Sequence, residues 1–166
     1  LIEEGLTGIV GPNGCGKSNI VESLRWCMGE NSAKSMRGSG MEDVIFSGTS
    51  NRPSKNISEV TLLLDNQNKE GPSHYKEFDE ISVRRKIEKD KGSKYYVNDK
   101  EVRARDVQTL FADLSTGAHS PSLISQGKIG QLVTAKPVER KSILEEAAGI
   151  SGIHARRQEA ETRLNA

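Results

Sequence analysis

Hydrophobic and polar positions near the start of the chain predict a strand, a loop and a helix in succession. The apolar run at residues 6–10 predicts a short buried strand. A glycine-rich turn is expected at residues 11–16. A helix is expected at residues 17–28, because Ile20, Leu24, Cys27 and Met28 fall on one face at helical spacing, and Gly29 is typical of a helix end.

The middle of the chain has the character of strands. Strands are predicted at residues 44–46, 57–65, 81–87, 95–97 and 123–125. The strand at residues 57–65 is apolar enough toward its end to predict burial on both faces. Asn98 and Asp99 predict a hairpin turn that leads into Val102. A short amphipathic helix is indicated by Val107, Leu110, Phe111 and Leu114.

The pattern changes at Pro137, which with Glu139 predicts the start of a helix. Gly149 is expected to end that helix, and Ser151 to cap a second one. The second helix has alternating charges and few apolar positions. Its pattern fits the start of a coiled coil or an ordinary solvated terminal helix, and it is too short to decide between them.

Composition indicates a globular domain. The chain has 166 residues, of which 34% are hydrophobic and 28% charged, with a net charge of +1, so no global field attracts nucleic acid. No apolar run approaches the ~20 residues that span a bilayer. Cys15 and Cys27 form no CxxC pair, which favours a reducing cytoplasm. The scattered histidines suggest no metal cluster. Leu1 in place of methionine and the charged end suggest a fragment.

Residues 11–18 fit the phosphate-loop pattern G-x-x-x-x-G-K-[ST]. The expected nucleotide-binding residues are Gly11, Pro12, Asn13, Gly14, Cys15, Gly16, Lys17, Ser18 and Asn19. Glycines let successive N–H groups point at phosphate oxygens, and the following helix adds its positive end. Lys17 is expected on the β- and γ-phosphates and the Ser18 hydroxyl on magnesium. The pattern therefore predicts binding of ATP and Mg²⁺.

The phosphate loop alone leaves the chemistry open. A GTPase is disfavoured, because no aspartate has glycine three positions later and no N-K-x-D sequence occurs. A small-molecule kinase stays possible. Residues 60–65 resemble a Walker B strand, but Asn66 stands where a catalytic glutamate is expected, which favours a buried strand ending in an Asp-Asn turn.

Several segments together resemble the N-terminal half of the ATPase head of the SMC (structural maintenance of chromosomes) family. The most specific are MRGSGMEDVIFSG and EEAAGI, supported by EVTLLLDN, LISQGKIGQLV and KPVERKSILEEAAGI. The resemblance implies an α/β P-loop NTPase of the ABC-type head class, with a mixed sheet around the P-loop helix. Residues 1–150 would form the N-terminal lobe and residues 151–166 the start of a coiled-coil arm.

The resemblance also implies roles for particular residues. Gln126 matches the Q-loop glutamine, which joins the magnesium shell and orients the attacking water. Arg37 matches an arginine that reaches the phosphates, where phosphoryl transfer builds negative charge. Asn19 would support the loop, and Cys15 would act through its backbone N–H.

The implied function is an ATP-driven DNA-organising motor. ATP binding would engage two heads and hydrolysis would release them, in chromosome condensation, segregation and cohesion and in DNA replication. The implied partners are DNA, bound without sequence specificity, a C-terminal lobe of the same chain and a kleisin subunit. The resemblance also implies a homodimer formed through a hinge and through ATP-bridged heads. No membrane partner is implied, and the expected location is the nucleoid-associated cytoplasm. The signature motif and Walker B are missing here, so this segment is expected to be inactive alone.

Other interpretations stay open. DNA contact would use a local patch formed by Lys34, Arg37, Arg52 and Lys55, although loop cations are usually just solvated. A coiled-coil repair ATPase of the RecN or RecF type shares the P-loop but fits MRGSGMEDVIF less well. A structural tether that uses nucleotide only for stability, and a P-loop kinase, are the remaining alternatives.

Overall fold

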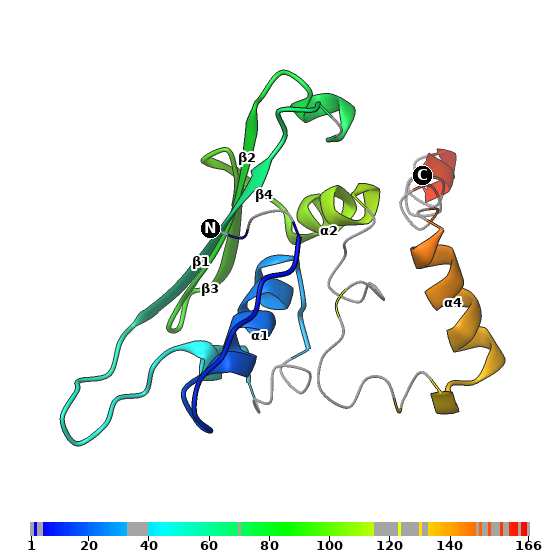
Figure 1. The fold of residues 1–166 in the computed structure, drawn as a ribbon. Helices are drawn as coiled ribbons and strands as arrows, with labels where there is room; N and C mark the ends of the chain where they lie inside the picture. The colour runs from blue at the N-terminus through cyan, green and yellow to red at the C-terminus, as the bar shows by residue number, and fades with distance from the viewer. Residues whose placement is uncertain are drawn as a thin grey trace.

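A four-stranded antiparallel sheet with two helices against one face forms the body of the protein (Figure 1). The structure is a computed structural model. It describes residues 2, 5–32, 40–69, 71–114, 123, 130, 133–148, 150, 153, 157, 160–162 and 164–165.

The sheet has the strand order β1-β2-β3-β4. Its strands are β1 (Ile57–Asp65), β2 (Glu80–Glu88), β3 (Gly92–Val97) and β4 (Lys100–Val102). Buried and half-buried residues alternate along β2, because successive side chains point to opposite faces of a sheet. The predicted strands at residues 57–65, 81–87 and 95–97 are therefore confirmed.

The turn between β3 and β4 is also as predicted. Asn98 and Asp99 have φ angles of 46° and 62°, and a two-residue hairpin turn of this type needs positive φ at both positions. Asn98 also forms two hydrogen bonds with Ser82. The Ser82 N–H donates to Asn98 Oδ1 at 2.8 Å, and the Asn98 N–H donates to the Ser82 carbonyl at 2.9 Å. The turn is thus held to β2 by side chain and backbone.

The helices are α1 (Lys17–Cys27), α2 (Ala104–Asp113) and α4 (Pro137–Ala147), with short 3-10 turns η2 (Met41–Val44) and η3 (Ser73–Tyr75). In α2, the Arg103 N–H donates to Asp106 Oδ2 at 3.0 Å and caps the first turn. Val107, Leu110 and Phe111 are buried, which confirms the predicted amphipathic helix.

The core lies between the sheet and the helices α1 and α2. Its buried members are Cys27, Ile81, Val83, Tyr95, Val97, Val107, Leu110 and Phe111. A second cluster joins Trp26, Ile45 and Ile87. The predicted apolar face of α1 is only partly buried: Ile20 is 41% exposed, whereas Arg25 and Trp26 are buried. The sheet buries the C-terminal end of α1, and this decides which of its residues are inside.

Two strand predictions are wrong in this structure. Residues 6–10 form no strand, and Leu6 and Val10 are almost fully exposed, because no described strand lies beside them to pair with. The described sheet is accordingly antiparallel rather than mixed. Residues 44–46 are not a strand either: Asp43 accepts the N–H of Gly40 at 3.0 Å, and a 3-10 turn forms instead.

The burial predicted for β1 is also wrong. Its residues alternate between exposed and half-buried, and Leu63 is 63% exposed. Among the described residues, helices cover one face of the sheet only, and every second residue of β1 is exposed (Figure 1).

Helix α4 begins as the sequence predicts, with Pro137 in its first turn and Glu139 accepting the Lys136 N–H at 2.8 Å. Helix α4 lies apart from the sheet (Figure 1). Gly149, Ser151 and most of the predicted strand at residues 123–125 lie outside the described residues. Within the described part of the chain, no helix combines the length and apolar character that crossing a membrane requires.

Candidate functional site: the phosphate loop and the helix behind it

The backbone of the phosphate loop depends on glycine at two positions. Gly14 and Gly16 have φ angles of 81° and 94°, a region that residues with a side chain rarely adopt. Gly16 is also the N-cap of α1 and offers no side-chain acceptor. The N–H groups at the start of α1 are therefore left for an external acceptor, and together with the helix dipole they favour an anion.

Lys17 lies folded over this loop. Its Nζ donates to the carbonyls of Gly11 and Pro12, both at 2.7 Å, and lies 3.9 Å from Cys15 Sγ. A Cβ added at Gly11 would lie 2.8 Å from Cys15 Sγ, so a side chain there would force the loop to move. The ammonium is thus held at the loop by exposed contacts that an anion can replace.

Residues 11–16 form the predicted turn, and α1 follows it with Ser18 and Asn19 exposed in its first turn. The assignment of residues 11–19 to nucleotide binding stays a prediction. Arg37 and Gln126 lie outside the described residues. No group of three His, Cys, Asp or Glu side chains suited to a metal occurs in the part of the chain described here. The site fits Mg²⁺ only in the manner of P-loop proteins, where one hydroxyl, phosphate oxygens and water surround the ion.

At its other end, α1 is held by a buried arginine of β2. The Arg85 side chain donates from Nη1 to the carbonyl of Trp26 at 2.7 Å and to that of Glu30 at 2.6 Å. Its guanidinium lies 4.5 Å from the ring centre of Trp26 and 4.7 Å from that of Tyr95. A cation at the carbonyl end of a helix is favoured by the dipole that also favours an anion at the opposite end.

Further buried polar groups fix the chain after α1. Arg25 and Glu30 form a buried ion pair at 3.0 Å, and Glu30 Oε1 accepts the Ser32 N–H at 2.8 Å. The amide of Gln108 on α2 donates to the Gly29 carbonyl at 2.9 Å. The segment that leaves α1 is therefore anchored to both the sheet and α2.

Cys27 is a structural thiol. Its Sγ donates to the carbonyls of Val83 at 3.4 Å and Val60 at 3.5 Å. Burial raises the pKa of the Cys27 thiol to about 11, so it stays protonated and unreactive at neutral pH.

Sequence reasoning missed the anchor at the end of α1. One signal was present: Ile81, Val83 and Ile87 predict an inward row on β2, and Arg85 falls in that row. A charge in an apolar row indicates a buried partner, although the identity of that partner cannot be read from the sequence.

Only two residues of the predicted DNA patch are among the described residues. Arg52 and Lys55 are exposed in the loop between η2 and β1, which is shaped by the pairing of Thr49 with Arg52. Lys34 and Arg37 lie outside the described residues. The patch stays a prediction.

Comparisons with known proteins agree with one another. The sequence matches the family described as "RecF/RecN/SMC N terminal domain" over residues 1–128. It is 60% identical to the chromosome partition protein Smc of Cereibacter sphaeroides over 166 residues, which are 100% of this chain and 14% of that protein. The chain thus spans about one seventh of the length of this relative.

Two solved structures are similar in fold. One comes from work on ATP-driven dimerisation and DNA-stimulated activation of SMC ATPases. It has a TM-score of 0.72 at 30% identity, and the aligned part is 88% of this chain and 86% of the solved chain. The other is an Smc head bound to the C-winged helix domain of ScpA. It has a TM-score of 0.76 at 27% identity, and the aligned part is 87% of this chain and 44% of the solved chain.

Proposed function

The chain belongs to the RecF/RecN/SMC N-terminal domain family, and we propose that it is the ATP-binding half of the head of a chromosome-organising ATPase. The observation that carries the proposal is the phosphate loop. Its helix has no side-chain cap at the N-terminus, and its lysine lies over the loop. That arrangement provides the donors and the charge that a triphosphate requires.

Each residue of the loop has a distinct task in this proposal. The N–H groups following Gly14 and Gly16 bind phosphate oxygens. Lys17 would exchange its two carbonyl contacts for the β- and γ-phosphates, and Ser18 would hold Mg²⁺, which supplies positive charge against the phosphates. Gln126 would complete the magnesium shell and orient water, and Arg37 would stabilise the transferred phosphoryl group; both assignments rest on the sequence resemblance.

Hydrolysis would require a second lobe. The phosphate-loop residues supply binding groups but no general base, so we expect binding without appreciable turnover by this chain alone. The exposed segment at residues 6–10 supports the idea of a missing neighbour, because Leu6 and Val10 present apolar surface next to the loop. Two such heads, bridged by ATP, would form the active ATPase.

The proposed partners follow the relatives. A solved Smc head binds the C-winged helix domain of ScpA, and we extend a kleisin-type partner to this protein. DNA binding without base specificity, in chromosome condensation and segregation, is proposed from the similarity to Smc proteins and SMC ATPases. Residues 1–150 would form the lobe and residues 151–166 the start of a coiled-coil arm in the nucleoid-associated cytoplasm.

Titration calorimetry with Mg-ATP tests the binding step. The chain should bind Mg-ATP, and Lys17→Met should weaken binding by at least about tenfold, because the ammonium is lost. Lys55→Met removes an exposed lysine outside the loop and should leave affinity unchanged. Equal affinities for all three proteins, or no heat with any of them, would contradict the proposal.

A further inference from the structure

The phosphate loop contains the single Asn-Gly pair of the sequence, Asn13 and Gly14. Asparagine is a chemically labile residue, because the backbone nitrogen of the next residue can attack its side-chain amide. Glycine in the next position favours this reaction, since it has no side chain to crowd the nitrogen. The reaction is intramolecular, so its rate depends on how easily the nitrogen reaches the amide carbon.

The structure leaves both reacting groups accessible. Asn13 and Gly14 are exposed and form a turn just before α1. None of the described residues accepts a hydrogen bond from the Gly14 N–H, and none of them bonds to the Asn13 side-chain amide. A Cβ built on Gly14 would meet no heavy atom within 4 Å, so the space around this peptide is open. In the described part of the chain, no hydrogen bond or packed neighbour holds these two groups apart.

The pair formed by Asn31 and Ser32 differs in this respect. The Ser32 N–H donates to Glu30 Oε1 at 2.8 Å, so the nitrogen that would attack is already bound. Asn31 Oδ1 accepts the Tyr95 hydroxyl hydrogen at 3.2 Å, which also restrains the side-chain amide. We therefore expect this asparagine to be stable in the folded chain.

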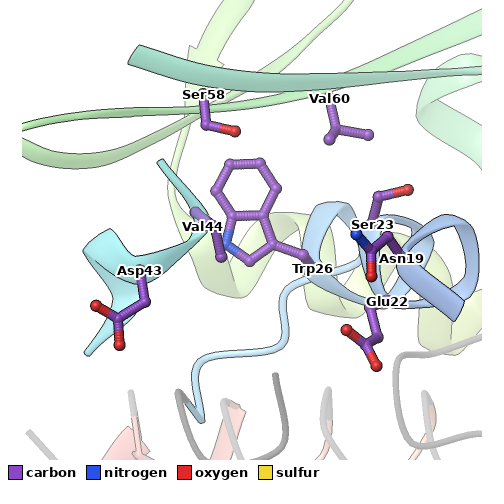
Figure 2. A pocket seen from close by; sticks show the side chains of 8 residues that line it. All are labelled: Asn19, Glu22, Ser23, Trp26, Asp43, Val44, Ser58 and Val60. Atoms are coloured by element: carbon purple, nitrogen blue, oxygen red, sulfur yellow. The ribbon is translucent and has the colours of Figure 1, made fainter. Parts of the chain in front are cut away.

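Asn19 is restrained by a helix. Figure 2 shows it on α1, where together with Ser23 it lines a cavity of about 390 Å³. The nitrogen that follows belongs to Ile20, which has a branched side chain and lies within the helical backbone. Asn13 is thus the one of these three asparagines that neither secondary structure nor a hydrogen bond protects.

We propose that Asn13 is a site of spontaneous deamidation, and that a nucleotide in the phosphate loop shields it. The Gly14 nitrogen forms a bond to Asn13 Cγ, the bond from Cγ to Nδ2 breaks, and ammonia leaves with the proton of the Gly14 nitrogen. Water then opens the cyclic imide at either carbonyl and gives aspartate or isoaspartate at position 13. The net reaction consumes one water and releases one ammonia.

Either product opposes nucleotide binding. The new carboxyl has an ordinary pKa of ~3.9 and is therefore negative at neutral pH, where it repels the phosphates. It follows directly after Pro12, whose carbonyl accepts Lys17 Nζ at 2.7 Å, so it also competes with the phosphates for the ammonium. The isoaspartate product in addition lengthens the main chain of the loop and redirects the N–H groups that follow.

A bound nucleotide slows the reaction because it fixes the loop. This part of the inference rests on the proposed function, in which phosphate oxygens bind the N–H groups that follow Gly14 and Gly16. These bonds hold the backbone around Gly14, and its nitrogen can then no longer turn toward the Asn13 amide. Chains without nucleotide therefore lose their binding site with time, whereas loaded chains keep it.

Trypsin digestion and mass spectrometry after incubation in mildly alkaline buffer test the proposal. Trypsin divides the first part of the chain into peptides 1–17, 18–25 and 26–34, and each contains one asparagine. Deamidation of peptide 1–17 should be at least about tenfold faster than that of the other two. Saturating Mg-ATP should slow it by at least about tenfold and leave the other peptides unchanged.

Titration calorimetry with Mg-ATP relates the modification to binding. The affinity of the unchanged chain should fall in step with deamidation of peptide 1–17. Asn13→Gln closes the larger ring slowly, so its affinity, whatever the starting value, should stay constant during the incubation. Asn31→Gln is the matched control, because the same change away from the loop should leave the fall in affinity as it is.

Two results overturn the inference and leave the proposed function standing. One is deamidation of peptide 1–17 no faster than that of the other peptides. The other is an equal rate with and without Mg-ATP, when calorimetry shows that Mg-ATP binds. If the freshly prepared chain binds no Mg-ATP, the proposed function is overturned and the shielding with it.

Discussion

At the scale of single residues, two cations act at opposite ends of one helix. The Lys17 contacts over the phosphate loop are exposed, whereas Arg85 is buried against the Trp26 carbonyl at the end of α1 and the Glu30 carbonyl just beyond it. The first can exchange its partners for an anion at little cost. The second cannot, because a guanidinium removed from water and then deprived of its carbonyls would be an unpaired buried charge.

Arg85 is therefore expected to dominate the stability of this region. Arg85→Met removes one buried donor from each of the Trp26 and Glu30 carbonyls and should lower the free energy of unfolding by ~2–4 kcal/mol. The neighbouring Arg84→Met, which loses an outward pair with Asp99, should cost less than ~1 kcal/mol. Urea unfolding followed by circular dichroism measures both; equal losses would contradict the assigned role.

The raised pKa of the Cys27 thiol predicts that the free energy of unfolding falls in alkaline solution. Its pKa in the folded state is about 11, against an ordinary value of 9.0, so the unfolded chain releases this proton first as pH rises. The stabilisation is fully present below pH ~9 and is lost between pH ~9 and ~11, by ~2–3 kcal/mol. Burial also raises the pKa of Tyr75 and Tyr95, which adds a slope of the same sign.

Urea unfolding between pH 8 and 11 isolates the thiol. Cys27→Ala should flatten the fall in stability, whereas Cys15→Ala, at an exposed thiol, should leave it intact. An unchanged slope in Cys27→Ala would assign the pH dependence to other groups.

At the scale of elements, the hairpin of β3 and β4 shows how a turn sets the register of a sheet. Positive φ angles at Asn98 and Asp99 close the turn, and the contacts between Asn98 and Ser82 tie it to β2. The register places Tyr95 opposite Val102 on the inner face, where both meet the core. A slip of one residue would turn both outward.

The turn can be tested by substitution at one position. Asn98→Ala adds strain in the left-handed region and removes the acceptor of the Ser82 N–H, and should lower stability by ~1–3 kcal/mol. Asn98→Gly removes the same acceptor without the strain and should cost less. Thermal unfolding of the two variants gives the comparison, and a larger loss in the glycine variant would refute the role of φ.

At the scale of the whole molecule, the antiparallel sheet and its helices form a complete core, whereas the segment before the phosphate loop does not. Leu6 and Val10 are exposed beside the loop, and Val138 and Leu144 are exposed on α4. Single exposed apolar residues are ordinary, but a run of them next to the candidate site suits a surface that the proposed second lobe would cover.

Reconstitution tests this view. The chain alone should hydrolyse ATP negligibly, and addition of the separately produced remainder of a head should restore turnover. Leu6→Asp should leave the stability of the isolated chain within ~0.5 kcal/mol and abolish the restored activity. Leu63→Asp, exposed on the outer face of the sheet, should preserve it. Turnover by the chain alone, or equal activity of both variants, would show that no second lobe is needed at residues 6–10.

The sequence by itself determined the elements whose signals are local. The glycine turn at residues 11–16, the strand at residues 81–87 and the Asn98-Asp99 turn depend on neighbours a few residues away, and each forms as predicted. The positions of Arg37 and Gln126 rest on the sequence resemblance alone.

Only the tertiary structure decided burial. Arg85 is joined to partners 55 and 59 positions away, and no local pattern identifies them. Likewise, whether residues 6–10 pair or β1 is covered on both faces depends on which distant segments reach them. Backbone conformation follows from adjacent residues, whereas removal from water requires a second surface, and the sequence order does not state where that surface comes from.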